Sequence, residues 1–253
     1  MILLSLKNLV KSFGGLAAVA GVSLEVNRGD VVGLIGPNGA GKTTVFNLVT
    51  GAIPPDDGNI FFDGRNLAGL APHQIVRLGL ARTYQTIRLF PKISVLENVL
   101  CGCHCRMRSG VLSSFFRLPA QRREERSALD RAMEELEFVG IADKRRLAAG
   151  GLAYGDQRRL EIARALASEP KLLVLDEPAG GMNEQETMEL RGLIAAILAR
   201  DITVMLIEHD IGFVMRVSNR LAVMENGALI AEGPPGEIRR DPRVIEAYLG
   251  VDD

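Results

Sequence analysis

A glycine-rich loop that ends in a lysine and two threonines is the segment of this chain best suited to bind a polyphosphate. Glycines let several backbone N–H groups turn toward one anion, and a helix that starts behind the loop presents further unpaired amides. We expect the lysine to bridge the terminal phosphates and the Thr43 hydroxyl to ligate magnesium. The sequence therefore predicts a nucleotide-binding site. The loop residues are Gly36, Pro37, Asn38, Gly39, Ala40, Gly41, Lys42, Thr43 and Thr44.

Two adjacent carboxylates end a second apolar segment, Leu172 to Leu175. Ligands of parallel sheets gather at the carboxyl ends of the strands. Asp176 is suited to hold magnesium through water, and Glu177 to orient or deprotonate an attacking water. The alternative is a pair of acids that caps a helix.

A histidine follows a third apolar segment, Thr203 to Ile207. His209 is placed to reach the γ-phosphate of a bound nucleotide. A histidine at a strand end can also have a purely structural role, with its hydrogen bonds satisfied locally.

The elements that position these residues follow from the hydrophobic pattern. Short apolar runs from Leu3 to Val26 and a strand at Asn59 to Gly64 predict an antiparallel β edge. The strands 172–175 and 203–207, separated by a helix over 184–199, predict a parallel sheet. The runs 220–224 and 228–231 are typical of a hairpin with an Asn-Gly turn.

Between about Ser94 and Ala167 the pattern becomes helical. A helix over 121–139 has apolar residues at Leu129, Met133, Leu136 and Val139, and a second helix is expected over 157–167. The mixed charges at 122–126 are typical of a solvated helix face, with a binding patch as the alternative. We predict an α/β fold in a single domain, 1–253, with an inserted helical sub-lobe at about 87–168. A helical tail is expected at about 234–253.

Composition limits the classes of partner. The chain has 253 residues, 30 of them basic and 31 acidic, so no nucleic-acid footprint or polybasic membrane patch is expected. Its apolar segments are too short to span a bilayer. The N-terminus lacks the basic region and cleavage site of a signal peptide, and we interpret it as the first strand of a cytoplasmic protein.

Three cysteines and a histidine crowd into one short segment. Structural zinc sites use pairs of ligands separated by a long loop, and this spacing does not provide that. We therefore expect ordinary thiols at a helix end, with a metal site as the alternative. The residues are Cys101, Cys103, His104 and Cys105.

Together these segments resemble the nucleotide-binding domain of ABC transporters over nearly the whole chain. The resemblance implies a P-loop ABC ATPase core that binds ATP and Mg²⁺. It implies that Phe13 stacks on adenine and that Gln85 senses magnesium and the membrane subunit. It also implies that Glu177 is the catalytic glutamate and His209 the switch histidine.

Two further family segments depart from the usual pattern. The family's Leu-Ser-Gly-Gly-Gln stretch is matched in part by Leu152, Ala153, Tyr154, Gly155 and Asp156. The missing serine hydroxyl removes a donor to the γ-phosphate of the opposite subunit, a loss of about 1.5–3 kcal/mol. Either backbone donors compensate or one composite site is weaker. The dimer-contact loop corresponds to Gly180, Gly181 and Asn183, with asparagine where aspartate is usual.

The variant motifs are similar to those of branched-chain amino acid import ATPases, as are the tail 242–250 and the segment 110–119. This implies ATP hydrolysis that powers import, at the cytoplasmic face of the inner membrane. The implied partners are a second ATPase subunit (paralogue or self), two membrane permeases and, indirectly, a periplasmic solute-binding protein, with no nucleic acid.

Several alternatives stay open. Related ATPases carry urea, amides or other amino acids, and the lipopolysaccharide exporter ATPase shares much of the tail. Soluble ABC ATPases that act on DNA or ribosomes need a long coiled-coil insertion or two fused nucleotide domains, which this chain lacks. A non-hydrolytic regulatory subunit is suggested by Ala153 and Asn183 and opposed by Lys42, Asp176, Glu177 and His209.

Overall fold

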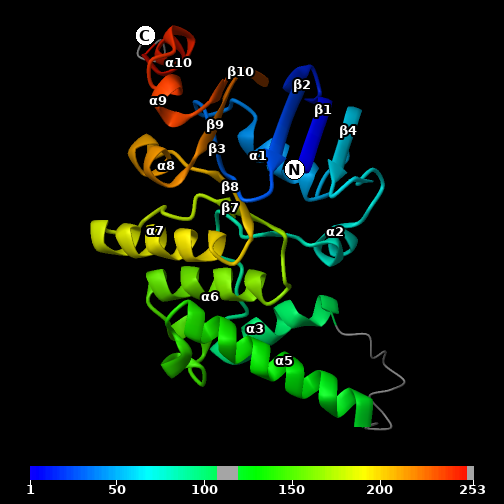
Figure 1. Ribbon diagram of the computed structural model, residues 1–253, viewed down its shortest axis with the longest axis vertical. Helices are drawn as coiled ribbons and strands as arrows, with labels where there is room; N and C mark the ends of the chain where they lie inside the picture. Colours follow the sequence, from blue (N-terminus) through cyan, green and yellow to red (C-terminus); the bar gives the residue numbers. More distant parts are fainter. Residues whose placement is uncertain (107–118, 250–253) are drawn as a thin grey trace.

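The computed structural model describes residues 1–106 and 119–249 (Figure 1). It contains two sheets, with helices on both sides of the larger one. The segment 110–119, which resembles import ATPases in sequence, lies outside the described residues except for Pro119. The smaller sheet is antiparallel, in the order β2-β1-β4-β5. Its strands are β1 (Ile2–Phe13), β2 (Leu16–Asn27), β4 (Asp57–Phe62) and β5 (Arg65–Asn66).

The larger sheet has six strands in the order β10-β9-β3-β8-β7-β6. All neighbours pair in parallel except β9 and β10, which form an antiparallel hairpin. The sheet is therefore mainly parallel, as predicted. Its strands are β3 (Val31–Ile35), β6 (Leu80–Arg82), β7 (Leu172–Asp176), β8 (Thr203–Ile207), β9 (Arg220–Glu225) and β10 (Ala228–Gly233).

The central strands are continuously apolar because both faces of the sheet are covered. In β7, Leu173 and Leu175 join one hydrophobic cluster with the helices, whereas Leu172 and Val174 join a second. The second cluster also contains Phe46 of α1 and the buried residues of the antiparallel sheet. The phosphate loop thus connects β3, which lies between the two clusters, to α1, which packs in the second one.

The helices are distributed around these sheets. In Figure 1, α3, α5 and α6 pack together at the lower end of the molecule, whereas α9 and α10 lie at the opposite end. The helices are α1 (Lys42–Val49), α2 (Pro72–Leu78), α3 (Val95–Cys103), α5 (Pro119–Phe138), α6 (Tyr154–Leu166), α7 (Glu184–Leu198), α8 (Ile211–Val217), α9 (Pro235–Ile238) and α10 (Pro242–Leu249).

Two expectations for the helical region need correction. In α5, Leu129 is 42% exposed, and the buried positions of that turn and the next are Ala128 and Ala132. The other expected positions hold, because Leu136 and Val139 are buried and Met133 packs against the same core. Only Leu129 turns outward, and the small alanines take its place in the packing. The helix expected from Gln157 begins at Tyr154, which brings Gly155 into its first turn.

The hairpin β9–β10 closes on Asn226 and Gly227, both with positive φ (47° and 80°), as a type I′ turn requires. The Gly227 carbonyl accepts a hydrogen bond from Ala20 N–H of β2 at 2.8 Å and so ties the two sheets together. Among the described residues, no helix is both long and apolar enough to cross a membrane.

Candidate functional site

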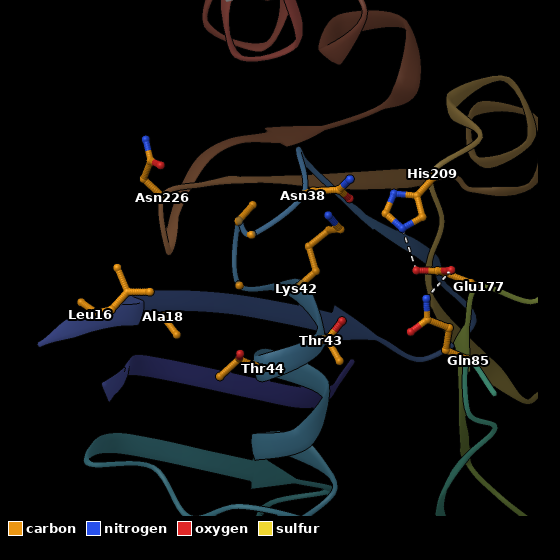
Figure 2. Close-up of a pocket in the computed structure, with 14 residues that line it drawn as sticks. Leu16, Ala18, Asn38, Lys42, Thr43, Thr44, Gln85, Glu177, His209 and Asn226 are labelled. Carbon is orange, nitrogen blue, oxygen red and sulfur yellow. Dashed lines mark hydrogen bonds and ion pairs between the residues drawn. The ribbon is translucent and has the colours of Figure 1, made fainter. Parts of the chain in front are cut away.

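The loop after β3 curls tightly because three of its glycines have positive φ. A Cβ at Gly36 would lie 2.0 Å from the Met224 carbonyl oxygen, and one at Gly41 would lie 2.1 Å from the Ala18 carbonyl oxygen. Both positions therefore require glycine. The loop lines a pocket of about 400 Å³ with residues of β2, α1 and the ends of neighbouring strands (Figure 2).

Lys42 is the first residue of α1 and lies inside the loop. Its side chain donates hydrogen bonds to the Gly36 carbonyl at 2.6 Å and to the Pro37 carbonyl at 2.8 Å. Burial lowers the pKa of this ammonium, and the charge of Glu177 partly offsets the effect. The loop therefore concentrates a cation and the open amides of a helix N-terminus beside Thr43 and Thr44, which also line the pocket.

Glu177 lies at the opposite wall of the pocket, between two polar side chains (Figure 2). The Gln85 side-chain amide donates to Glu177 Oε2 at 2.8 Å, and His209 Nε2 lies 2.6 Å from Glu177 Oε1. Glu177 has a φ of 48°, a conformation that costs a non-glycine residue roughly 1–3 kcal/mol and is concentrated at functional sites. The fold thus brings together three residues that are distant in sequence.

These side chains meet because β6, β7 and β8 are parallel neighbours whose carboxyl ends share one edge of the sheet. Glu177 follows β7 directly, His209 lies two residues after β8 and Gln85 lies three residues after β6. This edge is where open α/β sheets bind ligands.

Asp176 lies behind Glu177 and has a partner that the sequence analysis missed. Arg82 Nη2 contacts Asp176 Oδ2 at 2.6 Å, with both side chains nearly fully buried. Arg82 also donates to Asn47 Oδ1 of α1 at 2.8 Å. The arginine therefore fixes the end of β7 against the helix that follows the phosphate loop. The only local signal was a basic residue at the end of the short apolar run Leu80–Ala81.

The segment Leu152 to Asp156 lies away from this pocket. Ala153 is the N-cap of α6 and is exposed, with no side-chain cap, and Gly155 is buried in the first turn. The three residues Ala153, Gly155 and Asp156 line a separate groove of about 600 Å³ beside α7. Asp156 is paired there with Lys144. The structure thus separates this segment from the phosphate loop of its own chain.

Comparison with known proteins places these features in a family. The ABC transporter family profile matches residues 19–180, and a profile described as branched-chain amino acid ATP-binding cassette transporter matches residues 228–253. Over 98% of both chains, the sequence is 49% identical to the high-affinity branched-chain amino acid transport ATP-binding protein LivG of Salmonella typhimurium. It is 47% identical, with the same coverage, to BraF of Pseudomonas aeruginosa, which has the same description.

The chain belongs to the ABC transporter family of ATP-binding proteins. It is therefore an ABC ATPase, and the family interpretation of its sequence is confirmed. A solved structure with the same fold is the ADP conformation of an ATP-binding cassette of an ABC transporter. That structure is 34% identical, has a TM-score of 0.85 and covers 99% of both chains.

The dimer-contact loop expected in an ABC ATPase runs from the end of β7 to α7. Gly180 N–H donates to the Glu177 carbonyl at 3.2 Å, and Gly181 has a φ of 77° beside the Tyr154 ring. Asn183, where aspartate is usual, is the N-cap of α7 and accepts from Glu186 N–H at 2.9 Å. Asparagine caps helices as well as aspartate, so this role does not need the lost charge.

Phe13, expected in an ABC ATPase to stack on adenine, ends β1 and is 51% exposed. The Lys11 ammonium lies 5.7 Å from its ring centre. It does not belong to the residues that line the phosphate-loop pocket, whereas Leu16, Ala17 and Ala18 of β2 do. Its role toward adenine stays a prediction.

The cysteines lie at the end of α3, as the sequence indicates. Burial raises the pKa of the Cys103 thiol to about 11, and its Sγ donates to the Ala128 carbonyl at 3.6 Å. Cys101 is exposed and Cys105 is half-buried. Within residues 1–106 and 119–249, no group of three or more His, Cys, Asp or Glu side chains is arranged to hold a metal ion.

Proposed function

We propose that this ABC ATPase hydrolyses ATP to power the import of branched-chain amino acids through a membrane transporter. The observation that carries the proposal is the arrangement of Gln85, Glu177 and His209 across the pocket from Lys42. A buried cation for the phosphates faces a carboxylate that is held by two polar partners. This is the arrangement that phosphoryl transfer to water requires.

In this mechanism the loop amides and Lys42 neutralise the phosphates of ATP. Glu177 orients the attacking water and accepts its proton, and His209 steadies the γ-phosphate. The fixed φ of Glu177 and its two side-chain partners hold the carboxylate in one orientation before ATP arrives. Phe13 would stack on the adenine from the neighbouring hairpin.

Magnesium is the cation that suits the oxygen donors of this site. Thr43 and Gln85 line the pocket and would offer a hydroxyl and an amide oxygen. Asp176 ends the strand beside the pocket, where it is paired with Arg82, and would act on the ion through water. When bound, the ion would neutralise part of the negative charge of the phosphates.

The separated segment Leu152 to Asp156 supports a paired arrangement. We propose that its backbone amides bind the nucleotide of a second ATPase subunit, a paralogue or a second copy of this chain. The loop with Gly180, Gly181 and Asn183 would contact that subunit. ATP then closes the pair, and hydrolysis reopens it.

Residues 1–253 would act as one nucleotide-binding domain at the cytoplasmic face of the inner membrane. The helical sub-lobe, about 87–168, and Gln85 would pass the closure to two permease subunits, which a periplasmic binding protein supplies with solute. The choice of solute is supported by the descriptions of the relatives, LivG and BraF, and by the family match of the tail.

The test is transport in membrane vesicles that contain the complete complex co-purified with this chain. We expect ATP-dependent uptake of leucine, isoleucine and valine, and none with the Glu177→Gln variant. Uptake of urea, amides or another amino acid in place of these three would refute the solute. Recovery of ribosomes or DNA in place of permeases would refute the transport function itself.

A further inference from the structure

We propose that the buried pair Arg158 and Glu161 of α6 is a positioning device for Gln85. The pair grips the backbone beside Gln85 and so transmits movement of the partner-facing end of α6 to Glu177. This inference rests on the proposed function, because it assumes that α6 meets the nucleotide of a second subunit.

Arg158 binds the two backbone carbonyls on either side of the Gln85 Cα, those of Tyr84 and of Gln85 itself. Its Nη1 donates to the Tyr84 carbonyl at 2.7 Å, and its Nη2 donates to the Gln85 carbonyl at 2.5 Å. The fork of a guanidinium holds two acceptors in a fixed geometry, which a lysine does not do. Arg158 therefore fixes the backbone from which the Gln85 side chain reaches Glu177.

Glu161 holds the same segment through its amides. Its Oε1 accepts from Tyr84 N–H at 3.3 Å and, more weakly, from Arg88 N–H at 3.5 Å, while Oε2 contacts Arg158 Nη1 at 3.2 Å. The side chains of Arg158 and Glu161 are only 4% and 1% exposed. A third residue of the helix, Arg164, donates to the Arg88 carbonyl. One helix thus binds this loop at both ends.

A buried ion pair is weak evidence for a role in stability, because desolvation of both charges offsets most of their attraction. What this pair adds is a fixed connection between α6 and the loop that carries Gln85. Removal of either partner leaves a buried charge and frees backbone groups of the loop, so the two side chains act together.

The connection continues from the pair in two directions. Toward the start of α6, Arg158 Nη2 donates to the Tyr154 hydroxyl at 3.2 Å, and the Tyr154 ring lies beside Gly181 of the dimer-contact loop. Toward the pocket, the Gln85 side chain donates to Glu177. A shift of the first turn of α6 therefore reaches Glu177 through Arg158 and Gln85.

The experiment measures ATP hydrolysis, ATP affinity and cooperativity in the full-length chain with Arg158→Gln and Glu161→Gln. We expect kcat to fall roughly tenfold or more in each, because charge-assisted hydrogen bonds to the loop are lost. ATP affinity should change less than about threefold, since Lys42 and the phosphate loop are untouched. The Hill coefficient for ATP should fall toward one.

Two further variants test whether Arg158 acts through its forked guanidinium or through its positive charge alone. Arg158→Lys retains the charge without the fork and should recover only part of kcat. Arg159→Gln is the matched control, since Arg159 is the next residue of the same helix and pairs with Glu189 at the surface. We expect kcat of this control to stay within about twofold of the parent. Should Arg158→Gln not fold, the isosteric Glu161→Gln variant decides.

Hydrogen exchange gives a readout that does not depend on turnover. The amides of Tyr84 and Arg88 should exchange faster in the Glu161→Gln and Arg158→Gln variants, and unchanged in Arg159→Gln. Parent-like kcat, cooperativity and exchange in both variants would overturn the proposed role of the pair. If only the role of the Arg158–Glu161 pair is wrong, the parent chain still hydrolyses ATP and the Glu177→Gln variant does not. If the proposed function is wrong, hydrolysis is absent or insensitive to Glu177→Gln.

Discussion

The N-termini of α6 and α7 are neighbours in space and differ in how their first amides are satisfied. At α7, the Asn183 side chain accepts from Glu186 N–H at 2.9 Å, and the Glu186 carboxylate accepts from Asn183 N–H at 3.0 Å. At α6, the N-cap is Ala153, which makes no side-chain cap. The first amides of α7 are therefore capped by side chains of Asn183 and its neighbours, whereas those of α6 receive no side-chain oxygen from the N-cap.

The two ends are also fitted to each other. A Cβ at Gly155 would lie 2.7 Å from Glu186 Oε1, the carboxylate that closes α7. A side chain at position 155 would therefore displace the Glu186 carboxylate from its present place. Without the family serine, the donors at the start of α6 are backbone amides. The asparagine at position 183, in contrast, retains a helix cap.

The largest effect is expected for Glu177→Gln. The variant keeps the shape of the side chain but cannot accept a proton from water, so turnover should fall more than about a hundredfold while ATP still binds. Closed dimers should then accumulate with ATP. In these dimers, hydrogen exchange should slow at 154–156 in α6 and change little at 184–186 in α7. Equal protection of both helices would remove the distinction between their N-termini, and unchanged turnover would remove Glu177 from its role.

A smaller effect is expected for Ala153→Ser, which gives α6 the hydroxyl that the family usually has. If α6 meets a phosphate, the new donor should lower the ATP concentration for half-maximal hydrolysis by about tenfold or more. The measurement is the ATP dependence of hydrolysis together with thermal unfolding without nucleotide. A gain in stability without any change in the ATP dependence would mean that the serine only caps the helix, as Asn183 does for α7.

The side-chain cap of α7 is tested by the Asn183→Ala variant. Loss of the cap should reduce the free energy of unfolding by about 1 kcal/mol, as measured by urea denaturation. Asn183→Asp is the matched control and should be nearly neutral, because both residues accept from the same amide. If the aspartate variant lost as much stability as the alanine variant, the role of position 183 as a cap would be contradicted.

The parts of the site that depend on local sequence were predictable. The glycines of the phosphate loop, the acid pair Asp176 and Glu177 and the apolar strands all act through neighbours in the chain. Strand β7 was recognisable because burial on both faces leaves no polar position before Asp176. The same holds for the Asn226-Gly227 turn, whose backbone conformation selects its residues.

The parts that depend on pairing between distant segments were missed. Arg82 meets Asp176 only because β6 lies beside β7 in the sheet, and Arg158 meets Gln85 only because α6 packs on the loop after β6. No spacing in the sequence encodes either contact. The start of α6 was misplaced for a related reason, since Ala153 and Tyr154 carry no capping signal.

The smallest effect concerns Glu208, which holds the loop that leads to α7. Its Oε1 accepts from Ala179 N–H at 2.6 Å and its Oε2 accepts from His209 N–H at 3.2 Å. Burial raises the pKa of this carboxyl, and the two backbone hydrogen bonds partly oppose the rise. Glu208 therefore connects the loop before α7 to the segment that carries His209, although burial destabilises its charged form.

This shift gives a pH dependence with a defined sign. With its raised pKa, the native carboxyl keeps its proton at pH values where the unfolded chain, with a pKa near 4.5, has released it. The contribution of Glu208 to stability is therefore present at low pH and is lost as the pH rises through the raised pKa. Glu208→Gln cannot titrate, and its amide group cannot accept from His209 N–H, so it should be less stable than the parent by about 1 kcal/mol near pH 5. The difference should shrink as the pH rises toward 8 in urea denaturation, and a difference that is independent of pH would show that the carboxyl is not destabilised by burial.

The Glu208→Gln variant leaves Asn183 and Glu186 intact, so hydrogen exchange at 184–186 should stay slow while exchange at Ala179 changes. Faster exchange at both places would mean that the closure of α7 depends on Glu208 as well as on its own capping box.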